Sequence, residues 1–314
     1  MSFSYSVKKE LCGLMTDRDR KFACLYGMLL FCKNFDADSI VFQTENDMVC
    51  NLFCELADDV LERHKVVTVS SNEKKNNTVL YTLSIEKLED REEIIYRFHI
   101  SSRSLIHRIQ RENINNNDVF AFVAGAFLSC GSISEPLKDY HLEFSVPYYN
   151  LMLDLTELLG EIGFNVKSTE RKGNHVIYMK DSEVIEDLIT FMGATMSSIE
   201  LMNVKILKDV RNKANRIANC DAANIDRTLK ASDKQVADIE YIVDKIGMEN
   251  MPPDLAEIAE VRLEFPEMSL KELGEELEKP LGRSGVNHRL KRISALAEQL
   301  REEYNETEPN TKRQ

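Results

Sequence analysis

The sequence predicts an α+β protein with a duplicated N-terminal domain of αββαββα repeats, followed by an all-α helix-turn-helix domain. Two apolar runs of eleven residues, Phe22–Cys32 and Ala121–Gly131, each carry one central glycine, Gly27 and Gly125. The pattern that follows each run recurs at a period of roughly one hundred residues, which marks a duplication. Downstream, short amphipathic helices and a glycine-bearing turn precede a basic final helix, as in a helix-turn-helix.

The two apolar runs are predicted to be buried helices that pack on each other. Eleven residues are too few to cross a bilayer and suit a core helix. A glycine inside a helix costs about 1 kcal/mol relative to alanine. Glycine at the matched positions Gly27 and Gly125 therefore indicates a close approach of the two backbones.

In the first repeat, an alternating stretch at Ile40–Glu45 predicts a strand, and a helical pattern runs from Asn46 to His64. A hairpin of Val66–Ser70 with Leu80–Glu86 comes next. An amphipathic helix around Arg91–Phe98 closes the repeat.

The second repeat has the same order. A strand is predicted at Leu142–Pro147, and a helix from Tyr148 to Phe164. A hairpin of Val166–Glu170 with Val176–Lys180 follows, and a helix at Glu183–Met192 closes the repeat. The matched order extends the duplication over the whole N-terminal domain.

The domain boundaries follow from these patterns. The N-terminal domain is placed at residues 1–212, with repeats at about 20–115 and 117–212. Residues 213–230 are predicted to be a linker, because the segment NRIANCDAAN has little periodicity and many small polar residues. The helix-turn-helix domain is placed at 231–304, and the polar residues 305–314 are predicted to be a disordered tail.

The C-terminal domain begins with two predicted helices. Ser232 with Gln235 is a capping-box signature, and the apolar pattern that follows ends at Gly247. Two prolines then restart the chain, and a second helix is predicted from Asp254 to about Glu264.

The predicted turn comes next. Ser269 with Glu272 is another capping box, followed by a leucine face, and Pro280 ends that short helix. Gly282 supplies the turn. Ser284 is predicted to cap the last helix, which should run to about residue 303.

The last helix has two faces. At about 100° per residue, Val286, Leu290 and Ile293 fall on one stripe and should face the domain core. The opposite side should be exposed and close to DNA, because the N-terminal part of the second helix in a helix-turn-helix reads base edges in the major groove. The residues on this side are Ser284, His288, Lys291 and Arg292, with Gly285 beside them.

DNA contacts can be assigned on that geometry. We expect Ser284, Asn287 and His288 to contact bases or nearby phosphates, and Gly285 to let the backbone approach DNA closely. The basic residues are expected to bind phosphates, and Arg292 is also a candidate for a bidentate contact to guanine; they are Arg283, Arg289, Lys291 and Arg292. The alternative is a helical bundle whose basic face only improves solubility.

Composition and charge are compatible with a nucleic-acid partner. The net charge of −13 is unevenly distributed: residues 280–293 hold four basic residues and no acidic one, and residues 205–230 hold seven basic against three acidic. A DNA-binding surface needs cations only where it meets phosphate. No apolar run is long enough for a membrane span, no signal peptide opens the chain, and the seven cysteines form no C-x-x-C pair. We therefore expect a cytoplasmic, nucleoid-associated protein with no membrane partner and no small-molecule substrate.

Several strings resemble known families. VAGAFLSCG (Val123–Gly131) resembles the signature helix of the LAGLIDADG homing endonucleases, and CLYGMLLFCK (Cys24–Lys33) resembles a degenerate copy of it. Strings at Ser2–Leu11, Asn215–Asn224 and Gly282–Ile293 resemble the WhiA family, in which this fold is joined to a C-terminal helix-turn-helix. The resemblance covers nearly the full length of the chain.

The resemblance implies a sequence-specific regulator of transcription that binds double-stranded DNA and controls sporulation or cell-division genes. It also implies that four residues of the predicted linker fix the domain arrangement or contact DNA; they are Asn215, Arg216, Asn219 and Asn224. A partner transcription regulator or RNA polymerase is a further expected contact. The alternative for the segment is a plain linker.

The rival function is DNA cleavage by an active, metal-dependent LAGLIDADG endonuclease. Active members of that family place a metal-binding acid near the C-terminal end of each signature helix, and the aligned positions here are Cys32 and Cys130. A thiol is a poor ligand for magnesium. Displaced carboxylates stand just beyond the two helices, namely Asp36, Asp38, Glu135 and Asp139. We expect no enzymatic activity, no metal and no cofactor; an RNA-binding role is disfavoured because A-form RNA hides its major groove.

Overall fold

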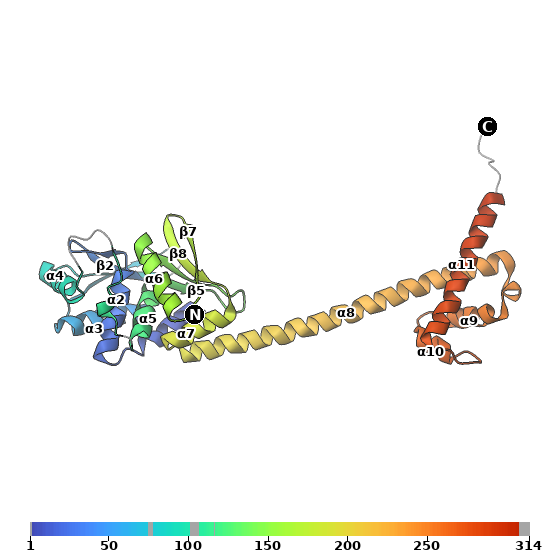
Figure 1. The fold of residues 1–314 in the computed structure, drawn as a ribbon, viewed down its shortest axis with the longest axis horizontal. Helices are drawn as coiled ribbons and strands as arrows, with labels where there is room; N and C mark the ends of the chain where they lie inside the picture. Colours follow the sequence, from blue (N-terminus) through green and yellow to red (C-terminus); the bar gives the residue numbers. More distant parts are fainter. Residues whose placement is uncertain (1, 75–77, 101–106, 116, 308–314) are drawn as a thin grey trace, which may run out of the picture. The chain divides into compact units, whose positions relative to one another are not determined.

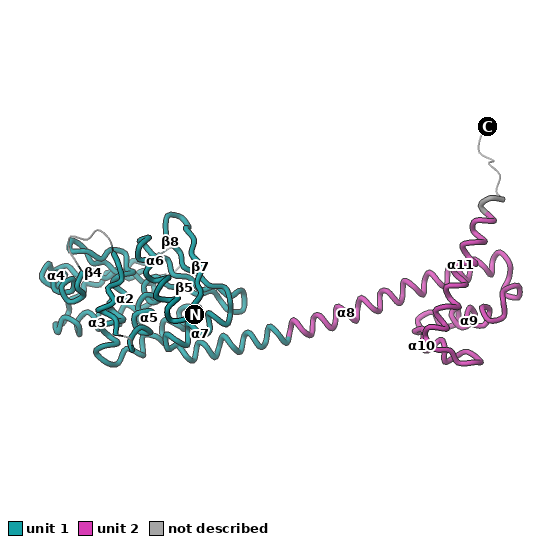
Figure 2. Tube along the Cα trace, viewed as in Figure 1, with its two compact units in different colours: residues 1–210 teal, residues 211–314 magenta. Residues whose placement is uncertain are grey.

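The computed structural model describes residues 2–74, 78–100, 107–115 and 117–307. The chain divides into two compact units, residues 1–210 and residues 211–314 (Figure 2). In the part of the chain that is described, no helix is long and apolar enough to cross a membrane.

Two adjacent helices form the centre of the first unit. They are α2 (Arg18–Leu30) and α5 (Val119–Cys130), the two predicted apolar helices. A Cβ atom on Gly27 would lie 2.3 Å from the Phe122 carbonyl oxygen, and one on Gly125 would lie 2.1 Å from the Cys24 carbonyl oxygen. The two helices therefore approach so closely that only glycine fits at both positions, as the sequence predicts.

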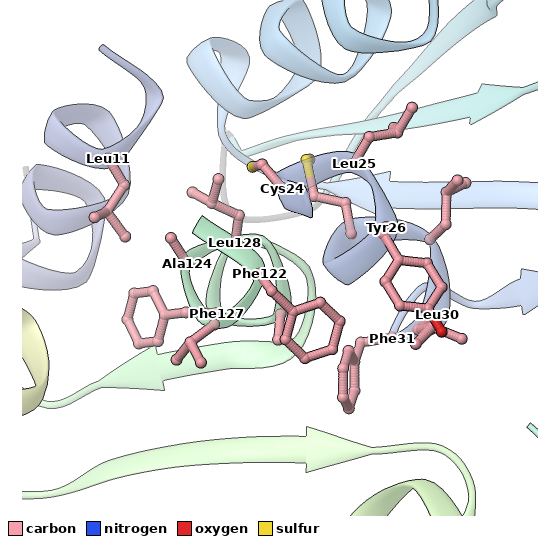
Figure 3. Packing of buried hydrophobic residues seen from close by; sticks show 14 of the residues in the cluster. Leu11, Cys24, Leu25, Tyr26, Leu30, Phe31, Phe122, Ala124, Phe127 and Leu128 are labelled. Atoms are coloured by element: carbon pink, nitrogen blue, oxygen red, sulfur yellow. The ribbon is translucent and has the colours of Figure 1, made fainter. Parts of the chain in front are cut away.

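Aromatic side chains fill the space around this helix pair (Figure 3). Tyr26 and Phe31 of the first apolar segment lie beside Phe122 of α5, with ring centroids 5.5 Å and 6.2 Å from that of Phe122. All three side chains are nearly inaccessible to solvent. The core of the unit thus lies where the two repeats meet.

The first sheet has the strand order β1-β2-β4-β3 and is antiparallel throughout. Its strands are β1 (Asn34–Phe35), β2 (Ile40–Thr44), β3 (Thr68–Glu73) and β4 (Val79–Ser84). Alternate residues of β2 are buried, as predicted from its pattern. The helices of this repeat are α3 (Asp47–Leu61) and α4 (Leu88–Arg97).

The second sheet repeats the first, with the order β5-β6-β8-β7; β5, β7 and β8 are labelled in Figure 1. Its strands are β5 (Gly131–Ile133), β6 (Leu142–Val146), β7 (Lys167–Arg171) and β8 (Asn174–Met179). The helices that follow are α6 (Tyr149–Glu161) and α7 (Ser182–Met192). The duplicated αββαββα order is therefore confirmed.

An additional helix, α1 (Phe3–Cys12), packs on this unit and was not predicted. The Glu10 carboxylate accepts hydrogen bonds from the backbone N–H groups of Met196 and Ser197, at 2.7 and 2.9 Å. These N–H groups belong to the first turn of α8 (Thr195–Ile246). Glu10 therefore satisfies donors that have no partner within that helix.

The second unit is helical. After the C-terminal part of α8 come α9 (Pro253–Glu264), α10 (Leu270–Glu275) and α11 (Arg283–Thr307). Short 3₁₀ turns occur at Arg111–Asn113 in the first unit and at Met248–Asn250 here. The helices of the second unit enclose an apolar core of their own, to which α8, α9, α10 and α11 all contribute.

The region predicted to be a linker differs from expectation. Residues 213–230 are helical throughout, in the middle of α8. Ser232 consequently opens no helix, and the predicted capping box with Gln235 is wrong. The Ser232 side chain is buried inside the domain and donates a hydrogen bond to the Pro266 carbonyl oxygen instead.

Two predictions about the last helix also need correction. The helix begins at Arg283, so Ser284 lies within its first turn and does not cap it. The N–H groups of Gly285 and Val286 both donate to the Gly282 carbonyl oxygen. At the other end the helix runs to Thr307, so residues 305–307 of the predicted disordered tail are helical; residues 308–314 lie outside the described residues.

Candidate nucleic-acid interface

The capping box before the turn between α10 and α11 is confirmed, but α10 ends at Glu275 rather than at the predicted Pro280. Ser269 caps α10 and forms a reciprocal capping box with Glu272. The N–H of Leu281 donates to the carbonyl oxygen of Gly274 at 2.9 Å. A Cβ on Gly274 would lie 2.0 Å from the Leu281 carbonyl oxygen, so glycine is required there for the chain to return against α10.

The orientation of α11 follows its predicted periodicity. Val286, Leu290 and Ile293 are buried in the core of the second unit. Ser284 and His288 are exposed. The N-terminal turns of α11 therefore present a polar face to solvent, and whether that face contacts DNA stays a prediction.

Gly285 lies on this accessible part of the helix. A Cβ at this position would meet the Leu281 side chain at 3.5 Å, which is ordinary van der Waals contact. The fold alone does not require glycine here. Its absence of a side chain is compatible with the predicted close approach of a ligand to the backbone.

Two of the predicted phosphate ligands already have acidic partners on α9. Arg289 pairs with Glu257 at 3.2 Å, and Arg292 pairs with Asp254 at 2.5 Å. The Arg289 side chain is 20% exposed and the Arg292 side chain 45%. Arg289 therefore links α9 to α11, whereas Arg292 is the more accessible of the two.

A cavity of about 630 Å³, the arginine pocket, opens between α8 and the helix-turn-helix. It brings together residues that are far apart in the sequence. Those that matter here are Asn224, Arg227, Arg262, Lys271, Arg283 and Asn287. Of the four linker residues that the resemblance singled out, Asn224 lines this pocket with the last helix, whereas Asn215, Arg216 and Asn219 are exposed elsewhere along α8.

Arg262 is a residue that the sequence analysis missed. It is 2% exposed, and one of its terminal nitrogens donates to the carbonyl oxygens of Met268 and Pro266, at 2.8 and 3.1 Å. Its position on α9 carried a signal: Leu255, Ile258 and Arg262 fall on one helical stripe, which makes an arginine there a buried residue.

The two positions predicted to align with the nuclease acids lie at a separate cavity in the first unit. Cys32 and Cys130 both line this cavity of about 500 Å³, together with Lys33 and Gln43. The Cys32 thiol donates to the Asn34 carbonyl oxygen at 3.0 Å. Burial raises the pKa of both thiols to about 12, so both are neutral at physiological pH.

Lys8 of α1 is placed next to this site and was not predicted. Its ammonium group donates to the Leu128 carbonyl oxygen at 3.3 Å and lies 5.6 Å from the centre of the Phe127 ring. Burial lowers its pKa to about 8. No feature of the sequence indicates this placement, because it depends on how α1 packs against α5.

Two of the four carboxylates considered as displaced metal ligands, Asp36 and Glu135, have other partners. Asp36 accepts the backbone N–H groups of Asp38 and Ser39, which stabilises the turn between β1 and β2. Glu135 accepts the N–H of Phe3 at the start of α1. Within the described residues, no group of three or more His, Cys, Asp or Glu side chains could hold a metal ion.

The outer strands of the two sheets carry mixed charge. Lys74, next to β3, pairs with Glu45, and Arg171 of β7 lies 3.9 Å from the carboxylate of Glu143. These two cations are thus offset by neighbouring acids. The arginine pocket differs, because no acidic residue is among those that line it.

Comparisons with known proteins identify a LAGLIDADG-like domain followed by a helix-turn-helix domain. The model of the WhiA LAGLIDADG-like domain matches residues 119–211, and the model of the WhiA C-terminal HTH domain matches residues 214–297. The chain is 37% identical over 320 residues to the probable cell division protein WhiA of Clostridium tetani, covering 97% of this chain and 100% of that protein. It is also 37% identical to the protein of the same description from Clostridium novyi, covering 96% of this chain and 99% of the relative.

A solved structure is similar over the same length. The crystal structure of full-length DUF199/WhiA from Thermatoga maritima matches with a TM-score of 0.56 and 25% sequence identity, covering 95% of this chain and 99% of that one. The two family models, the full-length relatives and this structure agree on both domains. The chain belongs to the WhiA family.

Proposed function

We propose that this protein is a sequence-specific, DNA-binding regulator of transcription that reads the major groove through the first turns of α11. The observation that carries the proposal is the orientation of α11, which buries Val286 and Leu290 and exposes Ser284 and His288 at the end that follows the turn. That is the end from which a helix-turn-helix contacts base edges.

The residues on α11 have different proposed roles. Ser284, Asn287 and His288 contact bases or nearby phosphates, and Gly285 lets the duplex approach the backbone. Arg283 and Lys291, for which no ion pair is found within the described residues, bind phosphates. Arg292 exchanges Asp254 for a phosphate or a guanine, whereas Arg289 keeps Glu257 and holds α9 against α11.

The regulated genes are proposed from the relatives. Two of them are named probable cell division proteins, and we propose cell-division genes as targets of this chain; sporulation genes are the alternative that the family resemblance implies. We propose that the protein acts at the nucleoid, in contact with a partner regulator or RNA polymerase.

The first unit is proposed to lack nuclease activity. The two positions that align with the metal-binding acids hold neutral thiols, and thiols bind magnesium poorly. The nearby carboxylates of Asp36 and Glu135 are occupied by backbone N–H groups. The first unit then serves as a scaffold or a docking surface.

Base reading can be tested on a site selected from a random duplex library. Asn287→Ala and His288→Ala should each weaken binding to the selected site by ~1–3 kcal/mol and hardly affect an unrelated duplex. Lys291→Ala should weaken both duplexes alike. Gln299→Ala, on an exposed distal position of α11, should affect neither. Equal affinity of the unmodified protein for the two duplexes would contradict the proposal.

A further inference from the structure

The arginine pocket is a strongly cationic concavity of the second unit. Four basic side chains line it: Arg227 comes from α8, Arg262 from α9, Lys271 from α10 and Arg283 from the start of α11. No acidic side chain is among the lining residues. A concave site of one charge sign concentrates the ligand of opposite sign.

At the base of the pocket, Arg262 is a buried cation without an acidic partner. Its hydrogen-bond acceptors in the described structure are neutral: the carbonyl oxygens of Met268 and Pro266, and the Ser232 hydroxyl. Its Nε is buried without any partner, as is the side-chain oxygen of Gln235, another residue that lines the pocket. Removing an arginine from water without a counter-ion is costly, and an anion bound nearby would offset that cost.

The cations at the rim are available to a ligand. Arg227 and Arg283 are exposed, and neither forms an ion pair within the described residues. Lys271 has only a loose contact of 3.7 Å with Glu275, and both side chains are largely exposed. An exposed ion pair of that kind contributes little to stability, so Lys271 can readily exchange Glu275 for another anion.

The pocket shares residues with the end of α11 that faces DNA. Arg283 and Asn287 line it, and both belong to the first turns of that helix. A duplex whose major groove receives those turns carries its phosphates along the groove edge, within reach of the same residues. Guanidinium groups bind phosphate oxygens through paired N–H donors.

We infer that the arginine pocket binds a phosphate of the DNA backbone, with Arg262 at its base and Arg227 of α8 closing it from the side opposite α11. This inference rests on the proposed function, because the phosphate belongs to the duplex that α11 reads. It gives α8 a part in DNA binding: the segment predicted to be a linker supplies a phosphate ligand, and Asn224 lies beside it. The pocket fixes the register of α11 on the duplex and carries no sequence preference of its own.

Arg227→Ala is the variant that tests the inference, because its side chain is exposed and its loss should leave the fold intact. Arg211→Ala is the matched control: it removes one arginine from the same helix, and at 3.6 residues per turn it projects roughly 160° away from Arg227. Affinity for the selected site and for an unrelated duplex is measured at several salt concentrations.

We expect Arg227→Ala to weaken binding to both duplexes by about threefold or more at low salt. The slope of log affinity against log salt should fall by about 1, as for the loss of one phosphate contact. Arg211→Ala should change neither quantity.

A set of duplexes with single methylphosphonate substitutions then locates the contact. One substitution should weaken binding of the unmodified protein and should cost the Arg227→Ala variant clearly less, because the variant has already lost part of that contact. Independent, additive losses at every phosphate would overturn the inference.

The outcomes separate the two proposals. If Asn287→Ala loses site preference but Arg227→Ala behaves like Arg211→Ala, DNA reading stands and the phosphate pocket is wrong. Inorganic phosphate, titrated into the DNA-free full chain during thermal unfolding, tests the other source of the same chemistry. Stabilisation that Arg227→Ala abolishes, without coupling to any DNA phosphate, would assign the pocket to a free anion and overturn the inference.

Discussion

At the scale of single residues, the sequence predicts a structural role best where the packing at one position admits only one type of residue. The matched glycines Gly27 and Gly125 are predicted to mark a close helix contact, and the structure confirms it. Arg262 and the Arg289–Glu257 pair could not be predicted in the same way, because their roles depend on partners from other helices. Helical periodicity predicts which face of a helix a side chain occupies, but it does not predict which residue of another helix will contact it.

The helix contact predicts the effect of adding a methyl group. Gly27→Ala should destabilise the first unit by about 1–3 kcal/mol, because its Cβ would overlap the Phe122 carbonyl oxygen. Gly160→Ala is the control: Gly160 lies in α6 with nothing within 4 Å of an added Cβ, and this change should stabilise the protein by about 0.5–1 kcal/mol. Urea unfolding measures both. Equal effects of the two changes would contradict the close packing.

The buried ammonium of Lys8 predicts a dependence of stability on pH. Burial lowers its pKa from 10.5 to about 8 in the folded state, so the unfolded chain binds more protons between these two values. The cost of burying the charge is therefore fully present below pH 8 and disappears as the pH rises towards 10.5. Lys8→Met should be more stable than the unmodified protein at pH 7, and its advantage should shrink over that window. An advantage that does not vary with pH would mean that Lys8 is well solvated.

At the scale of elements, the sequence predicts most helices and strands that have a buried face, but it does not predict the exposed middle part of α8. The helices α3 and α6 and the strands β2, β6 and β8 lie close to their predicted bounds because each buries apolar residues. The outer strands β3 and β7 are exposed along their whole length and were predicted as the hairpin partners of β4 and β8. Residues 213–230 are helical and almost uniformly exposed. A helix that buries nothing shows no apolar stripe, so the pattern by which helices are recognised is missing. The short strands β1 and β5 were implied by the fold class, but their residues were not assigned.

The continuity of α8 can be tested by breaking it. Ala218→Pro should remove an internal hydrogen bond and cost about 3 kcal/mol of local helix stability. The expected result is a loss of ellipticity at 222 nm, together with faster amide hydrogen exchange around the substitution. Ala218→Ser tests a mild change at the same site and should have little effect. If the proline variant matches the serine variant in both measurements, the segment is not helical in solution.

At the scale of the whole molecule, the net charge gives a misleading first impression. A chain with a charge of −13 would be expected to avoid DNA, yet its cations gather where acids are absent, around the arginine pocket. Elsewhere, as at Arg63 with Asp90 and Glu93, cations are paired with acids within the first unit. The local arrangement of charge, rather than its sum, is therefore compatible with DNA binding.

Each of the two units supports a different part of the proposed function. The first has a LAGLIDADG-like fold built around α2 and α5, with thiols, Cys32 and Cys130, at the positions predicted to align with the nuclease acids. The second exposes the polar face of α11. The central claim is therefore that the chain reads DNA through α11 and does not cut it.

One measurement tests that claim most directly. Fragmented genomic DNA is mixed with the full-length protein and magnesium, and both the bound fraction and all fragment ends are sequenced, beside an Asn287→Ala/His288→Ala double variant and the Gln299→Ala control. The claim predicts that the protein and the control enrich a short motif, that the double variant does not, and that no new ends arise. New ends at a defined site would show that the first unit still cleaves DNA, and a motif retained by the double variant would show that α11 does not read it.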